Sequence, residues 1–489
     1  MYKVLFAASE VHPLIKTGGL GDVAGILPTA LFKLGWDVGV ILPAYPNCKQ
    51  QLKNLVQAIS LSIPSVTMPV LILKGELPGV PVTFWLVDSP RHFNRLGNPY
   101  LGENGQEWPD NADRFTTFCK AIVHAFVTHP EQGWKPDIIH CNDWHTGLIP
   151  PLLDSVINRP ATVFTIHNLS YQGVFPHTTF KELQLPSYLW SPSALAFHNQ
   201  LSFMKGGLVF SDWLTTVSPS YAKEIMTPEL GCGLDDILRQ RSKNLTGILN
   251  GADYDRWDPV QDSLIEKPYS KESWHDKVKN KLALQHQFHL PENKTIPMFG
   301  FVGRLVTQKG IDLIIKILPK IISKQIQIIF LGEGEEHYQS GLETLARKYP
   351  KKIGLSLGYS ETLAHSIQAG VDIFLMPSYF EPCGLTQIYA LRYGTIPIVH
   401  KIGGLADTII DATPENLDQE LATGFIFNNP TSSELLNAIE RCLNLYSQPH
   451  LWKKLMLTAM AQDFNWKNSA KHYLELYYKL LQSRLTIKL

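Results

Sequence analysis

Short apolar runs alternate with longer segments in which apolar residues recur at helical spacing. In the first half of the chain, runs rich in β-branched and aromatic residues predict strands at 3–8, 37–42, 82–87, 137–140, 162–166 and 214–217. Helical patterns are expected between them. Alternation of this kind is typical of parallel sheets that are covered by helices on both faces.

The same alternation restarts after Asn250. Strands are predicted at 298–302, 327–331, 354–357, 372–376 and 396–400, with helices that include 310–324 and 385–393. The segment 253–273 is rich in Asp, Pro, Trp and Tyr and breaks the pattern, so we place a domain crossing just before it. A last helix is predicted at 466–484. The fold class is therefore α/β, with two Rossmann-like, doubly wound parallel-sheet domains.

Composition and charge narrow the function classes. The 489 residues hold 44 Lys and Arg against 44 Asp and Glu, which gives no global reason to bind nucleic acid or an anionic membrane. The six cysteines are scattered without a C-x-x-C pair, so we expect neither a metal site nor disulfides, and a cytoplasmic location. The N-terminal apolar run is too short for a signal peptide, and no apolar stretch has the length of a bilayer span.

The first predicted strand leads into a glycine-rich loop that ends at Asp22. Ligands of open parallel sheets bind beyond the carboxyl ends of the strands, which is where this loop lies. Gly18, Gly19 and Gly21 allow the backbone to approach a ligand, and Lys16 supplies a cation for a phosphate. The spacing is neither a dinucleotide fingerprint nor a Walker A loop. The alternative is a glycine turn with a solvated lysine.

Two cations follow the strand at 298–302. Arg304 ends the strand, and Lys309 stands before the next helix, so both would lie at one edge of the sheet. Fixed cations there would stabilise the charge that develops on a leaving diphosphate. The alternative is an exposed Arg and a helix N-terminal Lys. Because a Lys at that end opposes the helix dipole, we expect an anion near Lys309.

Other candidates stand at strand ends or in turns, each with a plain structural alternative. His167 follows a strand but could be a satisfied structural histidine, and Asp143 could be the N-cap of the next helix. Tyr359 could stack on a base or pack in its turn, and Asn250 precedes a glycine in what could be a simple turn. Cys383 lies near a predicted helix start, where we expect it to line a site without acting as a nucleophile.

Several motifs in order along the chain resemble those of bacterial glycogen synthases and plant starch synthases. The resemblance spans the whole chain and is carried by Lys16-Thr17-Gly18-Gly19-Leu20, by residues 140–145, 165–168 and 249–251, by 303–310 and by 381–387. It implies a GT-B fold, in which two Rossmann-like domains face a central cleft. The N-terminal domain would be 1–248, completed by the C-terminal helix 466–489, and the donor-binding C-terminal domain would be 249–465.

The resemblance also implies an activity, which is the retaining transfer of glucose from ADP-glucose to the non-reducing end of an α-1,4-glucan. UDP-glucose is the alternative donor, and no cofactor or metal is implied. The catalytic residues implied are Lys16, Asp143, His167, Arg304, Lys309 and Glu381. The substrate-binding residues implied are Thr17, Gly18, Gly19, Asp22, Asn250, Tyr359, Cys383, Gly384, Leu385 and Thr386.

One position departs from the pattern of related retaining transferases and narrows the resemblance to one branch of them. Related retaining transferases carry a second Glu eight positions after the first, and Tyr389 stands there in this chain, as it does in the synthase branch. Three other functions remain open at this point: a sugar-nucleotide epimerase on a similar scaffold, a non-catalytic glucan-binding protein, and a phosphorylase that uses pyridoxal phosphate.

Overall fold

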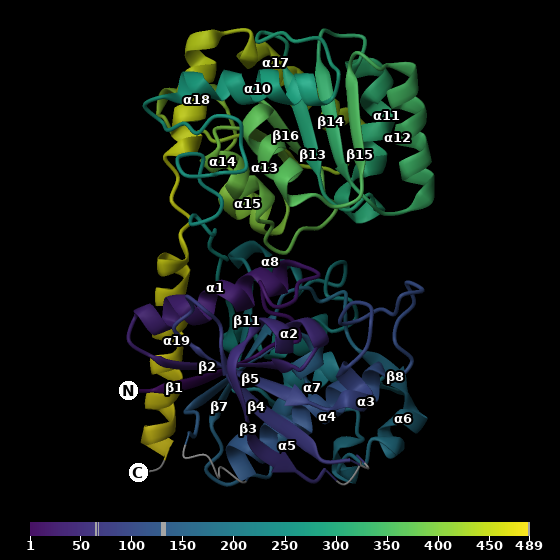
Figure 1. The fold of residues 1–489 in the computed structure, drawn as a ribbon, viewed down its shortest axis with the longest axis vertical. Helices are drawn as coiled ribbons and strands as arrows, with labels where there is room; N and C mark the ends of the chain where they lie inside the picture. Colours follow the sequence, from purple (N-terminus) through teal and green to yellow (C-terminus); the bar gives the residue numbers. More distant parts are fainter. Residues whose placement is uncertain (64–65, 67, 129–133, 488–489) are drawn as a thin grey trace. The chain divides into compact units, whose positions relative to one another are not determined.

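The computed structural model describes residues 1–63, 66, 68–128 and 134–487. The chain divides into two compact units (Figure 1). Unit 1 comprises Met1–Asn250 together with Trp466–Leu489, and unit 2 comprises Gly251–Asn465. The described segment 253–273 contains turns without a helix or strand, which agrees with the break in the sequence pattern. In the described part of the chain, no helix is long and apolar enough to cross a membrane.

Unit 1 is built on a nine-stranded sheet in the order β12-β11-β7-β6-β1-β2-β5-β4-β3. Its strands are β1 (Lys3–Ala7), β2 (Asp37–Pro43), β3 (Lys53–Leu61), β4 (Val70–Glu76), β5 (Thr83–Asp88), β6 (Ile138–Asn142), β7 (Ala161–Ile166), β11 (Trp213–Thr216) and β12 (Leu245–Gly247). All neighbours pair in parallel except β4, which is antiparallel to both β3 and β5. A separate three-stranded sheet holds β8 (Val174–Pro176), β9 (Ala196–Phe197) and β10 (Gln200–Ser202).

Between the second and third predicted strands a helical pattern was expected, but the described chain has there one short helix, at 46–51, and the strands β3 and β4, which extend the sheet in antiparallel fashion. Most residues of β3 are exposed or only partly buried. A strand at the edge of a sheet lacks the continuous apolar run of the buried parallel strands, so its signal in the sequence is weak. The sequence also gave no indication of the three-stranded sheet.

The chain order of unit 1 places two loops at one point of its sheet. From β1 the chain moves to β2 on one side, and it returns at β6 on the other side of β1. The loops that follow β1 and β6 therefore flank the switch point, where open α/β sheets bind ligands. Lys16 lies in the first loop, and Asp143 directly follows β6.

Helices cover the unit 1 sheet. They are α1 (Gly19–Lys33), α2 (Pro46–Gln51), α3 (Pro90–Phe93), α4 (Asn111–Val123), α5 (Ile149–Leu153), α6 (His177–Glu182), α7 (Phe203–Phe210), α8 (Pro219–Glu224), α9 (Asp235–Gln240) and α19 (Trp466–Ile487). The last of these, α19, runs beside α1 (Figure 1). Its Tyr477 packs against Trp36 with ring centroids 5.3 Å apart, and its hydroxyl lies 2.6 Å from Nδ1 of His140.

Unit 2 holds a six-stranded, fully parallel sheet in the order β15-β14-β13-β16-β17-β18. The strands are β13 (Met298–Val302), β14 (Gln327–Gly332), β15 (Ile353–Leu357), β16 (Ile373–Met376), β17 (Ile396–His400) and β18 (Phe425–Phe427). In chain order this is the arrangement 3-2-1-4-5-6 of the Rossmann fold, whose switch point lies between the first and fourth strands. Here those strands are β13 and β16.

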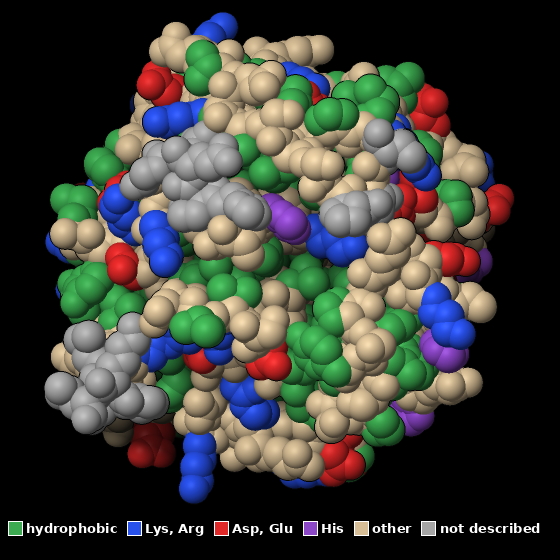
Figure 2. Space-filling model, turned by 90° about the horizontal axis from the view of Figure 1, so that it is seen from below, with side chains coloured by type: hydrophobic (Ala, Val, Ile, Leu, Met, Phe, Trp, Pro, Cys, Tyr) green, Lys and Arg blue, Asp and Glu red, His purple; other side chains and the backbone are tan. Residues whose placement is uncertain are grey.

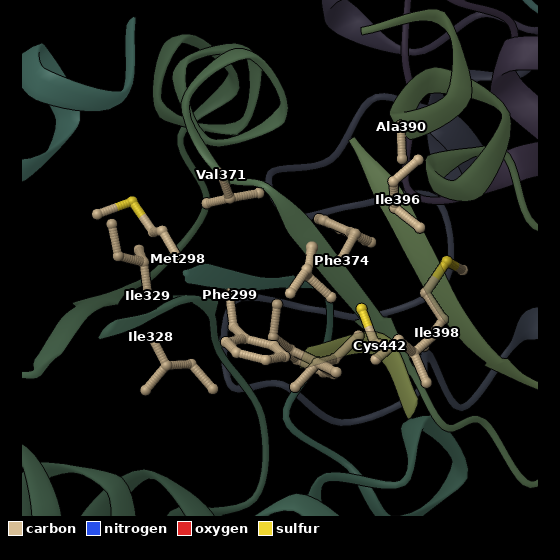
Figure 3. Close-up of a cluster of buried hydrophobic side chains, with 14 of the residues drawn as sticks. Met298, Phe299, Ile328, Ile329, Val371, Phe374, Ala390, Ile396, Ile398 and Cys442 are labelled. Carbon is tan, nitrogen blue, oxygen red and sulfur yellow. The ribbon is translucent and has the colours of Figure 1, made fainter. Parts of the chain in front are cut away.

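The helices of unit 2 are α10 (Lys277–Gln287), α11 (Ile311–Ile321), α12 (Glu336–Lys348), α13 (Glu361–Gly370), α14 (Thr386–Arg392), α15 (Gly403–Thr408), α16 (Pro414–Asp418), α17 (Ser432–Tyr446) and α18 (Pro449–Met460). Ile311, Ile314, Leu318 and Ile321 are buried on one face of α11. Phe299 and Phe374, from neighbouring strands, meet aliphatic side chains and Cys442 in the core (Figure 3). This core fixes the strands whose carboxyl ends carry the candidate site.

The surface carries no dominant charge in the view of Figure 2. Lys and Arg side chains alternate with Asp and Glu, and apolar side chains lie between them. This mixture agrees with the balance of 44 cationic and 44 anionic side chains in the sequence. Any recognition of an anion therefore depends on local groups.

Candidate active site

The candidate site of unit 2 begins where β13 and β16 end. Lys309 lies in a short 3-10 turn, Thr307–Lys309, which precedes α11. Gly310 follows with φ of 69°, and a Cβ at this position would lie 2.1 Å from the backbone oxygen of Pro377. Only glycine meets both conditions, the left-handed backbone and the close approach. The turn after β13 is therefore packed directly against the loop after β16.

This packing brings together Lys309 and Glu381. The Lys309 ammonium Nζ lies 2.5 Å from Glu381 Oε2, and the hydroxyl of Ser378 donates to the same oxygen at 3.1 Å. The Glu381 side chain is 8% exposed and that of Lys309 is 23% exposed. The anion that the sequence predicts near Lys309 is thus a carboxylate of the chain itself. Ser378 was not singled out from the sequence, although it lies two residues after the predicted strand.

A cavity of about 120 Å³ opens beside this pair. It is lined by Phe301, Val302, Gly303, Lys309, Leu375, Met376, Ser378 and Thr386. These residues come from the ends of β13 and β16 and from the start of α14, so the cavity lies at the switch point of the sheet. Its wall is apolar at the strands and polar at Lys309, Ser378 and Thr386.

Gly403 and Gly404 pack closely against the loop that carries Glu381. The Gly404 backbone N–H donates to the Glu381 backbone oxygen at 3.1 Å. A Cβ on Gly403, which has φ of 45°, would lie 2.0 Å from that same oxygen. On Gly404 a Cβ would lie 2.1 Å from the backbone oxygen of Cys383. These close approaches fix the backbone that carries Glu381, and the sequence alone did not indicate them.

The other predicted residues of unit 2 lie around this loop in different environments. Cys383 is buried, and Gly384 adopts φ of 71°. The helix α14 begins at Thr386, with Leu385 as its N-cap residue. Tyr359 is 72% exposed. Arg304 is exposed, and its Nη2 donates to Gln308 Oε1 at 3.1 Å.

Tyr389 occupies the place of the second Glu of related transferases and is a packing residue here. It is buried, and its ring is stacked on Trp257 with centroids 4.3 Å apart and planes 4° apart. The indole of Trp257 also stacks on His365. The aromatic stack anchors α14 to the segment that begins unit 2.

In unit 1 the predicted Lys16 loop is held by a residue that sequence reasoning missed. Glu10 is buried, and its Oε2 accepts hydrogen bonds from the Thr17 hydroxyl at 2.7 Å, from the Thr17 N–H and from the Gly18 N–H at 3.3 Å. Burial raises the pKa of Glu10, and the hydrogen bonds from Thr17 oppose that shift. A carboxylate three residues after the last residue of a buried strand was the available signal.

Lys16 and Asp22 form an ion pair across the same loop. Lys16 Nζ lies 2.7 Å from Asp22 Oδ1, and the Lys16 side chain is about one-third exposed. A Cβ on Gly21 would lie 3.1 Å from Lys16 Cγ, so the small residue leaves room for the lysine stem. Gly19 opens α1, and Gly18 is its N-cap residue. Lys16 is therefore oriented by Asp22 while its ammonium group stays accessible.

Asp143 is strained and buried. It has φ of 54° and ψ of 179°, a conformation that is costly for a residue with a side chain and that concentrates at functional sites. Burial raises the pKa of Asp143 to about 7, against the effect of hydrogen bonds from the backbone of His167 and Asn168. Asp143 stands at the N-cap position of the turn Trp144–Thr146, the structural alternative, but its side chain makes no cap bond, and its Oδ1 accepts from the His167 N–H at 2.7 Å.

His167 is neutral at physiological pH, because burial lowers its pKa to about 3. Its Nε2 lies 2.9 Å from Asn142 Oδ1. The Asn142 amide nitrogen donates to the Ala7 oxygen at 3.0 Å, so its Oδ1 must accept from His167. The imidazole therefore carries its proton on Nε2, and Nδ1 is left as an acceptor.

Asn250 is the last residue of unit 1 before the crossing. It is buried, and its Oδ1 has no hydrogen-bond partner in the described chain. Buried acceptors without partners are uncommon and mark places where a ligand or water completes the bonding. Among the described residues, no group of three or more His, Cys, Asp or Glu side chains is arranged to hold a metal ion.

Comparisons with known proteins show the family of the chain. The family description "Starch synthase catalytic domain" matches residues 3–240, and "Glycosyl transferases group 1" matches residues 284–455. A protein named glycogen synthase 2 from Nitrosococcus oceani is 62% identical over 488 residues, covering 100% of this chain and 99% of the relative. The chain belongs to the glycogen and starch synthase family.

Other relatives support the same assignment. Glycogen synthase 1 from Methylococcus capsulatus is 49% identical, with 98% of this chain and 97% of the relative covered. The catalytic domain of starch synthase IV from Arabidopsis thaliana, solved with ADP and acarbose, matches with a TM-score of 0.88 at 33% identity, covering 98% of this chain and 99% of that one. The fold is GT-B, and this member of the family is a hexosyltransferase. None of these relatives favours an epimerase, a phosphorylase or a non-catalytic binding protein.

Proposed function

We propose that this family member transfers glucose from ADP-glucose to the non-reducing end of an α-1,4-glucan with retention of configuration. The observation that carries the proposal is the Lys309–Glu381 ion pair beside a cavity at the switch point of unit 2. A cation that stabilises a leaving diphosphate and a carboxylate that binds sugar hydroxyls are the two groups that such a transfer needs. The ADP bound to the Arabidopsis relative supports the choice of nucleotide.

On the donor side, we assign the diphosphate to Lys309, to Arg304 and to the backbone near Gly384, Leu385 and Thr386. Arg304 and Lys309 both follow β13. Their fixed charges would stabilise the negative charge that grows as the glycosidic bond breaks. Tyr359, with its exposed ring, is assigned to stack on the adenine.

Glu381 and Lys309 change partners in this scheme. In the structure each neutralises the other at 2.5 Å. A diphosphate offers Lys309 a second anion, so Glu381 is released to accept hydrogen bonds from the glucose hydroxyls and to stabilise positive charge at the anomeric carbon. The hydroxyl of Ser378 holds the carboxylate in place during the exchange. Cys383 forms the adjacent wall.

From unit 1, we assign Lys16 to a phosphate, with Thr17, Gly18 and Gly19 placing the backbone and Asp22 orienting the lysine. Asp143 and His167 are assigned to the donor glucose. The neutral imidazole offers Nδ1 as an acceptor for a sugar hydroxyl. We assign the unpaired Oδ1 of Asn250 to substrate in the same way.

The proposed chemistry needs no carboxylate nucleophile. Most retaining glycosidases place two carboxyl groups about 5 Å apart, one of which attacks the sugar. Here the only carboxylate assigned to the anomeric centre is Glu381, and Tyr389 stands at the second position. We propose that the acceptor hydroxyl attacks from the face that the diphosphate leaves, and that the leaving phosphate oxygen takes its proton. We place the reaction in the cytoplasm, which the six free thiols support.

A donor panel tests the proposal. The purified chain is incubated with glycogen and either ADP-glucose or UDP-glucose, and the released diphosphate and the growth of the polymer are measured. We expect ADP release with equimolar chain extension, and loss of most turnover in Arg304→Ala. Arg347→Ala, a substitution of an exposed arginine in α12, is the matched control and should behave as wild type. Diphosphate release without polymer growth would contradict the proposal.

A further inference from the structure

The turn that carries Lys309 and the loop that carries Glu381 are joined by hydrogen bonds of the residues next to this ion pair. The Tyr379 N–H donates to the Gln308 backbone oxygen at 2.9 Å, and Nε2 of Gln308 donates to the Phe380 oxygen at 3.3 Å. Gln308 directly precedes Lys309, and Phe380 directly precedes Glu381. The two segments are therefore bonded to each other one residue before each partner of the pair.

The Tyr379 side chain adds a further bond between the same two segments. Its hydroxyl donates to Asp312 Oδ2 at 2.8 Å, and Asp312 lies in the first turn of α11. Burial, together with this bond, raises the pKa of Tyr379 to about 12, so the hydroxyl is a protonated donor at physiological pH. The other carboxylate oxygen, Asp312 Oδ1, is buried and has no hydrogen-bond partner in the described chain. The Tyr379 hydroxyl is therefore the group that orients this carboxylate.

This bond holds the loop in a direction that another of its contacts does not. Nδ1 of His400 lies 2.8 Å from the Ser378 oxygen, which joins the loop to the end of β17. Tyr379 and Asp312 join the loop instead to α11, which begins two residues after Lys309. The side-chain bond therefore acts on the spacing between the two segments that carry the ion pair.

The relative position of the two charged groups depends on the backbones that carry them. Lys309 has a flexible four-carbon stem, and its side chain is 23% exposed. Misplacement by about 1 Å can cost roughly a hundredfold in rate. Hydrogen bonds depend on distance and angle, so they limit such a displacement more narrowly than apolar packing does.

We propose that Tyr379 and Asp312 are positioning residues for the transfer, whose hydrogen bond fixes Glu381 relative to Lys309. Neither residue was singled out from the sequence, and neither is assigned to substrate. An acidic residue in the first turn of a helix is stabilised by the helix dipole, so the position of Asp312 alone indicates no function. Its bond to the loop that carries Glu381 is what distinguishes it. The role in transfer rests on the proposed function.

Steady-state rates with ADP-glucose and glycogen test the inference. Tyr379→Phe removes only the hydroxyl, and Asp312→Ala removes its acceptor. We expect each to lower kcat roughly tenfold and to leave the KM for glycogen unchanged, because the reacting groups are misplaced while the acceptor contacts remain. The two groups act through one bond, so the double variant should also lose only about tenfold. Wild-type kcat in either single variant, or a loss of about a hundredfold in the double variant, would overturn the inference.

Two further variants separate positioning from stability. Asp312→Asn keeps an oxygen acceptor for Tyr379 but loses the charge at the helix N-terminus, so its melting temperature should fall while kcat stays within about twofold of wild type. Tyr338→Phe is the matched control, because its hydroxyl lies 2.9 Å from Thr307 Oγ1 in the Lys309 turn. It should keep the wild-type kcat. An Asp312→Asn variant as slow as Asp312→Ala would overturn the inference.

Amide hydrogen exchange provides a readout that does not depend on transfer. Without substrate, the peptide that contains Tyr379 should exchange roughly fivefold faster or more in Tyr379→Phe and Asp312→Ala, the effect of losing one hydrogen bond. Tyr338→Phe should exchange as wild type does. Unchanged exchange in the first two variants would overturn the inference. If exchange is faster in both but wild type transfers glucose from neither donor, the bond between the two segments stands and the proposed function fails.

Discussion

Lys309 Nζ lies 2.5 Å from Glu381 Oε2, across 72 residues of sequence. The pair forms because the turn after β13 and the loop after β16 pack together at Gly310 and Pro377. In the proposed transfer Lys309 binds the diphosphate and Glu381 binds the glucose. The ion pair between the two side chains opposes both roles. In the proposed transfer, substrate therefore replaces this ion pair.

Substitution of Glu381 separates these roles. In Glu381→Gln, the hydroxyl of Ser378 keeps an acceptor but Lys309 loses its anion, so we expect ADP to bind several-fold more tightly. Turnover should fall by about a hundredfold or more, because the charge near the anomeric carbon is gone. Calorimetry with ADP and initial rates with donor and glycogen measure the two effects. Glu440→Gln, which breaks the exposed pair with Lys324, should change neither. Parallel losses of ADP affinity and turnover would contradict the exchange of partners.

The raised pKa of Asp143 predicts a specific pH dependence of the free energy of unfolding. Its pKa in the folded chain is about 7, above the ordinary 3.8, so the folded state binds more protons between those values. Its contribution to stability is complete below about pH 4 and is lost as pH rises through about 7. Relative to wild type, Asp143→Asn should therefore gain stability on the order of 4 kcal/mol between those limits. Urea unfolding at a series of pH values measures the difference.

The control for this experiment is Asp154→Asn, at an exposed position of unit 1. It should stay parallel to wild type across the same pH range. A pH-independent difference between Asp143→Asn and wild type would show that the carboxyl is not held in its protonated form. Asp143→Asn should also lose transfer activity at every pH if Asp143 contacts the donor glucose.

The close packing at Gly310 predicts that alanine substitutions at two glycines of unit 2 will have different effects on stability and turnover. Gly310→Ala must accept a left-handed backbone and a Cβ about 2.1 Å from the Pro377 oxygen, so the turn has to open. We expect a loss of several degrees in melting temperature and a large loss of turnover. Gly341→Ala is the control, because Gly341 lies inside α12 with nothing within 4 Å of its added Cβ. That substitution should stabilise the chain slightly. Equal melting temperatures for the two variants would contradict the packing at Gly310.

The contacts of Glu10 lead to the prediction that its hydrogen bonds, and not its charge, fix the position of the Lys16 loop. All three hydrogen bonds end on Oε2, so Glu10→Gln keeps an acceptor for Thr17 and Gly18. Glu10→Ala removes it, and we expect the KM for the donor to rise at least tenfold while kcat changes less. The glutamine variant should restore most of the affinity. Equal defects in the two variants would show that the charge is what matters.

The sequence predicted unit 2 better than unit 1, for a physical reason. The strands at 298–302 and 396–400 match β13 and β17 to the residue, because a parallel strand buried on both faces appears as a continuous apolar run. The edge strand β3 lacks such a run, and β4, although it begins with the apolar run 70–73, was not predicted; helical patterns were expected in this region. The final helix was found in the sequence but extends to Ile487.

For the site, the sequence indicated which strand ends carry chemistry but not which side chains meet. A local pattern predicts an anion near Lys309 from the helix dipole, yet no local pattern links it to a carboxylate 72 residues away. The role of Glu10 depends on hydrogen bonds that form only once the loop folds back onto it. The sequence could not show whether the Asp143 side chain caps the next turn, because this depends on the positive φ there and on its bond to the loop after the next strand.

The central claim is that Lys309 stabilises the departing diphosphate. Initial rates of ADP release with glycogen and ADP-glucose, measured for wild type, Lys309→Ala and the exposed-lysine control Lys324→Ala, test it most directly. We predict that Lys309→Ala loses about a hundredfold or more in kcat while it remains folded, and that Lys324→Ala keeps the wild-type rate. Near-normal turnover in a folded Lys309→Ala variant would contradict the account.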